Sequence, residues 1–122
     1  MQCSLSLVDP ASGAQIFHTA KGVLAKRTLA GLAWARPRRP DDFCEGQYWD
    51  RWQQLHLPDL GLPWPELALC WTAFTPGVSS VLIGTRNFAR LREDIPAVEH
   101  GPLQRETLSA LQEAHTQAGA TR

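Results

Sequence analysis

The sequence predicts an α/β fold built on a parallel sheet, and three observations support this prediction. Two short apolar segments, residues 3–8 and 23–25, flank a helix-like segment at 11–21. A β-branched segment at 79–84 stops at a glycine, and several other segments carry apolar residues three to four apart. A helix between two apolar strands is a βαβ unit, which implies parallel strands and a right-handed crossover.

The first three elements form this βαβ unit. Residues 3–8 alternate polar and apolar side chains and stop at Asp9-Pro10, as a strand does. Residues 11–21 predict a short helix, and Gly22 stands where a C-cap glycine belongs. Residues 23–25 are then a short, buried second strand.

The middle of the chain predicts a loop and two helices. Residues 36–42 are rich in proline and charge and predict a solvated loop, although they contain the P-x-x-P pattern of a polyproline ligand. Residues 46–57 predict an amphipathic helix with an aromatic packing face of Tyr48, Trp49, Trp52 and Leu55. After a proline-rich turn, Pro65 suits the first position of a buried helix that reaches Phe74.

The last part predicts the third strand and two further helices. Residues 79–84 are the strand, Asn87 can cap a helix over 88–98, and residues 103–118 form a final amphipathic helix. We expect one domain over 1–122. Its parts are strand-helix-strand (1–35), loop and aromatic helix (36–62), and helix, last strand, capped helix and C-terminal helix (63–122).

Length and composition limit the classes of function that the chain can have. A chain of 122 residues suits one domain. Twelve basic residues balance twelve acidic ones, which argues against binding to nucleic acid or to a membrane surface. No apolar run approaches the length of a membrane span, and no signal sequence is visible. Three widely spaced cysteines and four dispersed histidines predict reduced thiols, no metal site and a cytoplasmic location.

Two segments are candidate anion sites. A strand that ends at Gly84 and continues into Thr85, Arg86 and Asn87 before a helix presents free N–H groups and side-chain donors, and Arg90 lies one turn further on. The alternative is that Asn87 only caps the helix. Lys26 and Arg27 follow the second strand, on the usual ligand side of a parallel sheet, although they also suit a solvated strand end. No nucleophile–base pair, Walker loop or G-x-G-x-x-G motif is present.

Residues 22–29 (GVLAKRTL) and 76–94 (PGVSSVLIGTRNFARLRED) resemble the C-terminal third of the aldo/keto reductases. The second block is the more specific one, because it matches the family's last strand and following helix. Residues 2–7 also resemble the family's sixth barrel strand, which begins with Gln. The likeness covers nearly the whole chain, with residues 41–61 matching least.

The resemblance implies a fold and an activity. It implies the C-terminal part of a (β/α)8 TIM barrel, with three parallel strands that correspond to strands six, seven and eight and cannot close a barrel alone. Family enzymes transfer a hydride between NADP(H) and an aldehyde or ketone. Their Asp, Tyr, Lys and His tetrad lies in the part that this chain does not match, so the resemblance implies no catalytic residue here.

The resemblance also implies a cofactor site for NADP(H), with NAD(H) as the alternative. Gln2 matches the residue that holds the nicotinamide carboxamide, while Lys26, Arg27 and Leu29 match positions at the nicotinamide and pyrophosphate. The residues that match the 2′-phosphate loop and the adenine contacts are Gly84, Thr85, Arg86, Asn87, Arg90, Glu93 and Asp94. The family carries Asn where this chain has Asp94.

Three functions remain open at this stage. The first is a truncated aldo/keto reductase-like protein that supplies cofactor contacts but is inactive alone. The others are a non-catalytic remnant that acts as an interaction module, and a small dinucleotide-binding module. Because the outer strands lack their barrel neighbours, we expect a marginal monomer that self-associates through open strand edges or pairs with a complementary N-terminal fragment.

Overall fold

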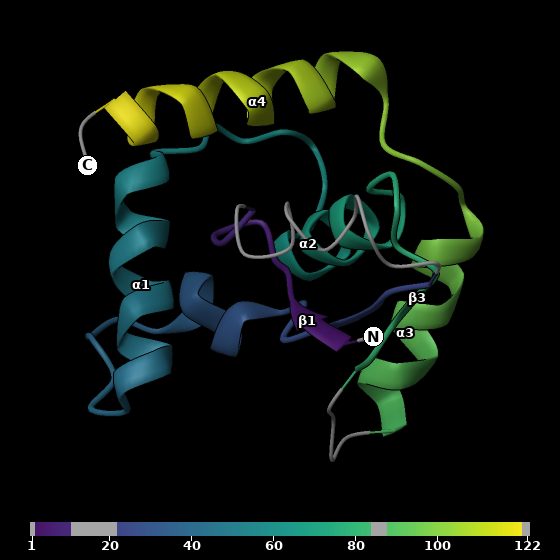
Figure 1. Cartoon of the computed structure of the whole chain (residues 1–122), viewed down its shortest axis with the longest axis horizontal. Coiled ribbons are helices and arrows are strands. Elements are labelled where there is room, and N and C mark those ends of the chain that lie inside the picture. Colours follow the sequence, from purple (N-terminus) through teal and green to yellow (C-terminus); the bar gives the residue numbers. More distant parts are fainter. Residues whose placement is uncertain (1, 11–21, 84–87, 121–122) are drawn as a thin grey trace.

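The computed structural model describes residues 2–10, 22–83 and 88–120. Its elements, in chain order, are β1 (Gln2–Ser4), β2 (Leu24–Lys26), the 3-10 segment η2 (Ala30–Ala35), α1 (Phe43–Leu55), α2 (Trp64–Ala73), β3 (Ser80–Val81), α3 (Phe88–Glu99) and α4 (Arg105–Ala120). The chain is therefore a mixed α/β protein, in which helices flank a small sheet (Figure 1).

The sheet is parallel, as the sequence predicts. Its strands lie in the order β1-β2-β3, and both pairs are parallel. Cys3, Ala25 and Val81 are register partners, and they face a cluster that includes Trp71 of α2. The predicted helix at 11–21, its cap at Gly22 and the handedness of this crossover depend on residues outside the described ranges.

The first strand is shorter than predicted. It ends at Ser4 rather than Val8, after which the Asp9 N–H donates to the Ser6 carbonyl at 3.0 Å in a tight turn. The reason lies in β2, because Arg27 turns to a left-handed φ of 60° and leaves no extended backbone for β1 to pair with. The sequence alternation past Ser4 does not reflect alternating burial, because Leu5, Ser6 and Leu7 are all buried.

The helices follow the prediction closely, with shifted starts. α1 begins at Phe43, since the Asp42 carboxylate accepts a hydrogen bond from the Glu45 N–H at 3.0 Å and caps it. Pro65 takes the second position of α2 rather than the first. The η2 segment was not predicted, because nothing in its alanine- and glycine-rich sequence has helical periodicity.

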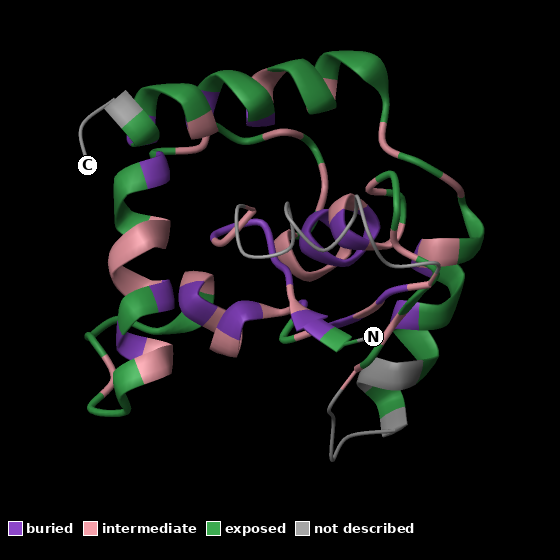
Figure 2. Ribbon diagram, in the orientation of Figure 1, coloured by how far each residue is buried: buried purple, intermediate pink, exposed green. Residues whose placement is uncertain are grey.

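The helices bury one continuous interior beside the sheet (Figure 2). α2 is buried along 67–70 and packs against α3, where the Cys70 thiol donates to the Ala97 carbonyl at 3.3 Å. α4 runs along one border of the molecule, next to the end of α1 (Figure 1). None of the helices in the described ranges is long and apolar enough to cross a membrane.

Candidate functional site

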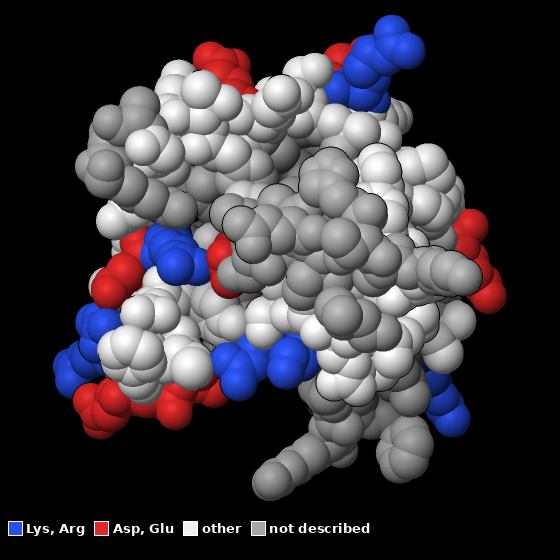
Figure 3. All heavy atoms as spheres, viewed as in Figure 1, with Lys and Arg blue, Asp and Glu red and all other residues white. Residues whose placement is uncertain are grey.

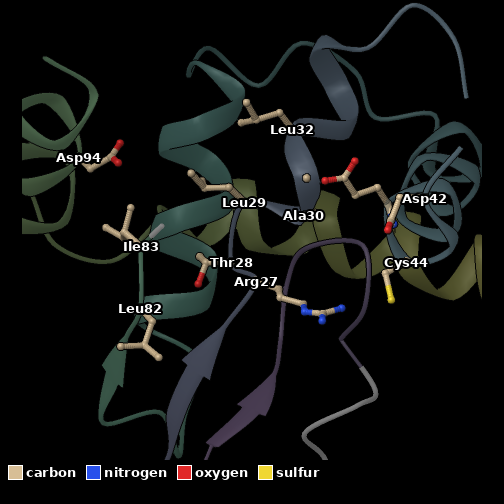
Figure 4. A pocket seen from close by; sticks show the side chains of 12 residues that line it. Arg27, Thr28, Leu29, Ala30, Leu32, Asp42, Cys44, Leu82, Ile83 and Asp94 are labelled. Carbon is tan, nitrogen blue, oxygen red and sulfur yellow. The ribbon is translucent and has the colours of Figure 1, made fainter. Parts of the chain in front are cut away.

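A pocket of about 510 Å³ opens at the carboxyl ends of β2 and β3 (Figure 4). Ligand sites in α/β sheets occur at this end of the strands, and this volume lies within the usual range of ligand pockets. The residues that line it are Arg27, Thr28, Leu29, Ala30, Gly31, Leu32, Asp42, Cys44, Glu45, Leu82, Ile83 and Asp94.

One wall of the pocket has an unusual backbone. Arg27, Ala30, Gly31 and Leu32 have φ values of 60°, 50°, 61° and 55°, and three of these four residues are not glycine. A left-handed conformation costs a non-glycine residue about 1–2 kcal/mol. A Cβ atom at Gly31 would lie 3.1 Å from Glu45 Cγ, so the Glu45 side chain would have to shift slightly to accept one.

The backbone of this wall forms tight turns. Leu29 has φ −89° and ψ 4°, and the next residue, Ala30, is left-handed. The Ala30 N–H donates to the Arg27 carbonyl at 3.0 Å and the Leu32 N–H donates to the Leu29 carbonyl at 2.8 Å, so these N–H groups close turns within the segment. Such backbone strain occurs preferentially at functional sites.

Arg27 supplies a permanent positive charge at one end of the pocket. Its guanidinium group points toward the start of α1 (Figure 4). Hydrogen bonds to the Cys44 thiol and then to the Tyr48 hydroxyl raise the pKa of Arg27 above its ordinary value. Because arginine is protonated at any accessible pH, this rise in pKa does not change its charge.

The carboxylates around the pocket have partners of their own. Asp42 caps α1, and Glu45 forms an ion pair with Arg36 at 3.1 Å. Asp94, from α3, is buried with 8% of its surface exposed. On the face shown in Figure 3, basic and acidic groups alternate and no extended patch of one sign forms.

The pocket brings together some of the residues expected at a cofactor site. Arg27, Leu29 and Asp94 all line it. Lys26 and the exposed Gln2 and Glu93 are not among the lining residues. Gln2 lies at the amino end of β1, where it pairs with Leu24, whereas the pocket opens at the carboxyl ends of the strands.

The expected phosphate loop is not part of the described structure. Gly84, Thr85, Arg86 and Asn87 lie outside the described residues, and for Arg90 only its place in α3 is defined. In sequence this loop directly follows Ile83, which lines the pocket.

Several lining residues were not singled out in the sequence. Thr28 could have been found, because it stands between two expected site residues in the same strand-end segment. Asp42, Cys44 and Glu45 could not, since they belong to the cap and first turn of α1, and only tertiary packing carries that turn to the end of the sheet.

The arrangement combines an exposed cation, a buried carboxylate and apolar surface from Leu29, Leu82 and Ile83. It suits a ligand that has an anionic group, a flat or apolar middle and a hydrogen-bond donor. The described part of the pocket holds no serine, cysteine or lysine paired with a base in the way that nucleophilic catalysis requires. No protein-family model matches the chain, and no curated protein is significantly similar to it.

Proposed function

We propose that this chain supplies the NADP(H)-binding side of an aldo/keto reductase-like oxidoreductase, within a partial (β/α)8 barrel. One observation carries the proposal. Arg27, Leu29 and Asp94 were expected at a cofactor site from two separate sequence blocks, and all three line one pocket at the carboxyl ends of parallel strands.

The sheet topology supports the barrel part of the proposal. The three strands are parallel and adjacent in chain order, as consecutive strands of a barrel are. A doubly wound sheet instead reverses its strand order at a switch point. Three free cysteines also suit a reducing compartment, so we propose a cytoplasmic location.

The pocket residues fit a dinucleotide in charge and polarity. The Arg27 guanidinium group suits a phosphate, which arginine binds through charge-assisted hydrogen bonds. Leu29, Leu82 and Ile83 offer apolar surface to a ring, and the Asp94 carboxylate can accept from an amino or hydroxyl group. The cofactor would supply the hydride when bound. The proton donor for carbonyl reduction belongs to the unmatched tetrad, so the chain alone is expected to be inactive.

Titration with NADPH, followed by the fluorescence of its nicotinamide, tests the proposal. We expect saturable binding that Arg27→Ala weakens by about 10-fold or more, the effect of one lost charged hydrogen bond. Arg38→Ala is the matched control, because Arg38 is an exposed loop cation outside the pocket lining. Absence of binding by the unmodified chain, or equal effects of the two substitutions, would refute the proposal.

A second variant tests the orientation of the ligand. Asp94→Asn keeps the size and the acceptor oxygen of the side chain, adds an amide donor and removes a negative charge that repels phosphates. We expect it to bind NADPH more tightly than the unmodified chain. Weaker binding by this variant would show that the phosphates lie away from Asp94. It would also show that the assignment of Asp94 to the adenine contact is wrong.

A further inference from the structure

A second pocket, of about 330 Å³, lies where α2 meets the end of α3 and the start of α4, and we call it the interhelix pocket. Its lining includes Glu66 and Cys70 of α2, Ala97 of α3 and the α3–α4 connection, which Figure 1 shows running between these two helices. It shares no lining residue with the pocket at the strand ends. Cavities of this volume between helices commonly bind small molecules, so this one is a separate candidate site.

Glu66 gives the interhelix pocket a negative charge. It is the single carboxylate among the described lining residues, and no Lys or Arg joins it there. Glu66 is half-buried, and its carboxylate has no ion-pair or hydrogen-bond partner within residues 2–10, 22–83 and 88–120. A half-buried carboxylate has lost part of its hydration, so a cation beside it is favoured over a neutral or anionic group.

The Glu66 charge also acts on the wall of the pocket. Cys70 lies one turn further along α2, on the same face of the helix. Burial raises the pKa of the Cys70 thiol, and the negative charge of Glu66 raises it further. Because this thiol donates to the Ala97 carbonyl at 3.3 Å, Cys70 offers a ligand an uncharged sulfur surface. Among the described lining residues, a bound cation would therefore meet one carboxylate and no competing Lys or Arg.

Three leucines supply the apolar part of the lining. Leu60, Leu62 and Leu103 are half-buried and pack against one of the core clusters. They leave apolar surface toward the pocket, and covering it with a ring or a branched chain is favourable in proportion to the area covered. Gln104 and Thr107, at the start of α4, add only uncharged hydrogen-bonding groups. The lining thus combines one carboxylate with apolar surface.

We propose that the interhelix pocket binds a small primary amine that carries an apolar ring or branched chain. The ammonium group donates hydrogen bonds to the Glu66 carboxylate, and the apolar group lies against the three leucines. A primary ammonium group suits this position because it has N–H donors and a carboxylate only accepts. The inference goes beyond the proposed NADP(H) site and does not depend on it.

Titration of the full chain with phenethylamine, followed by two-dimensional NMR, tests the proposal. We expect binding in the millimolar range, as for other ligands of this size, with shifts at the start of α2 and in the α3–α4 connection. Phenethyl alcohol has the same shape without the charge and should bind about 5-fold or more weakly. Phenylacetate, which is anionic, should not bind there. n-Butylamine has the same ammonium group and less apolar surface, so it should also bind more weakly than phenethylamine.

Substitutions of Glu66 isolate the role of its charge. Glu66→Gln keeps the shape of the side chain and should weaken phenethylamine binding by about 5-fold or more, with no change for phenethyl alcohol. Glu66→Lys should reverse the preference, so that phenylacetate binds and phenethylamine does not. Glu99→Gln is the matched control, because Glu99 is an exposed carboxylate at the end of α3 outside the pocket lining. NADPH binding should be the same in all three variants.

Three results would overturn the proposal. They are the absence of shifts at the interhelix pocket up to tens of millimolar phenethylamine, equal binding of the amine and the alcohol, and equal effects of Glu66→Gln and Glu99→Gln. Equal binding of n-butylamine and phenethylamine would refute the role of the three leucines. If phenethylamine bound as expected and NADPH did not bind, the proposed function alone would be wrong.

Discussion

His115 provides a long-range contact whose energetic contribution can be worked out from the structure. Its Nε2 atom lies 2.6 Å from the carbonyl oxygen of Leu7, 108 positions earlier in the chain, and its ring meets Trp71 edge-on with centroids 5.7 Å apart. One side chain on α4 therefore contacts both the turn after β1 and the buried helix α2. Replacing it should weaken the attachment of α4 to the rest of the protein.

The magnitude follows from the two contacts. Without the imidazole, the buried Leu7 carbonyl loses this donor, which costs about 1–3 kcal/mol. The aromatic pair contributes about 0.5–1.5 kcal/mol more. We therefore expect His115→Ala to lower the unfolding free energy by about 1.5–4.5 kcal/mol, and His115→Phe, which keeps a ring against Trp71, by about 1–3 kcal/mol.

Urea denaturation, followed by tryptophan fluorescence and by far-ultraviolet circular dichroism, measures these differences. Thr116→Ala is the control, since this exposed neighbour on α4 bonds only within its own helix, to the Gln112 carbonyl at 2.9 Å. Its effect should stay within about 0.5 kcal/mol, as for most surface substitutions. If His115→Phe and His115→Ala are both as stable as Thr116→Ala, the contact does not hold α4 in place.

Three other predictions concern pH, helix propensity and association. Burial raises the pKa of the Cys70 thiol, with a smaller effect of Glu66, above its ordinary value of 9.0. The unfolded chain therefore loses this proton first, so the unfolding free energy should fall as the pH rises above about 9, by up to about 1.4 kcal/mol per unit. Cys70→Ala should reduce this slope in denaturation at pH 8 and pH 10, and an unchanged slope would contradict the assignment. Gly46→Ala should change the unfolding free energy by less than about 1 kcal/mol, because two effects oppose each other. Alanine has the better helix propensity, but its Cβ atom would lie 2.8 Å from the Arg39 guanidinium carbon and displace that group. A loss above about 2 kcal/mol in thermal melts would show that Arg39 cannot move. The described residues include large apolar side chains that are exposed, among them Phe43, Ile95 and Leu82. Sedimentation at micromolar concentration should therefore show self-association that Leu82→Lys weakens, and a clean monomer would refute this.

The sequence predicted the kinds of element well and their ends less well. Periodicity located the aromatic helix and the buried helix after Pro65, because their apolar faces repeat at helical spacing. It overestimated the first strand, since alternation of polar and apolar residues in the sequence does not show where the neighbouring strand ends. The last strand was also predicted over 79–84 but spans only Ser80–Val81 in the described structure.

For the candidate site, the sequence could name only residues at strand ends and in a matched motif. Arg27 was named because the carboxyl end of a parallel strand is a known position for ligands, whereas Leu29 and Asp94 were named only from the resemblance. Sequence reasoning did not identify Cys44 and Glu45, because their place in the pocket depends on how α1 packs. No local pattern encodes that packing.

The sequence by itself thus determined a parallel α/β chain, the order of its three strands and of helices α1 to α4, and one group of side chains at the strand ends. Tertiary structure alone decided that the wall after β2 turns left-handed at Arg27 and that Thr28 is buried without a partner. The physical reason is that apolar periodicity reports burial within an element. Backbone strain and the loss of a hydrogen-bond partner arise only when separate elements pack together.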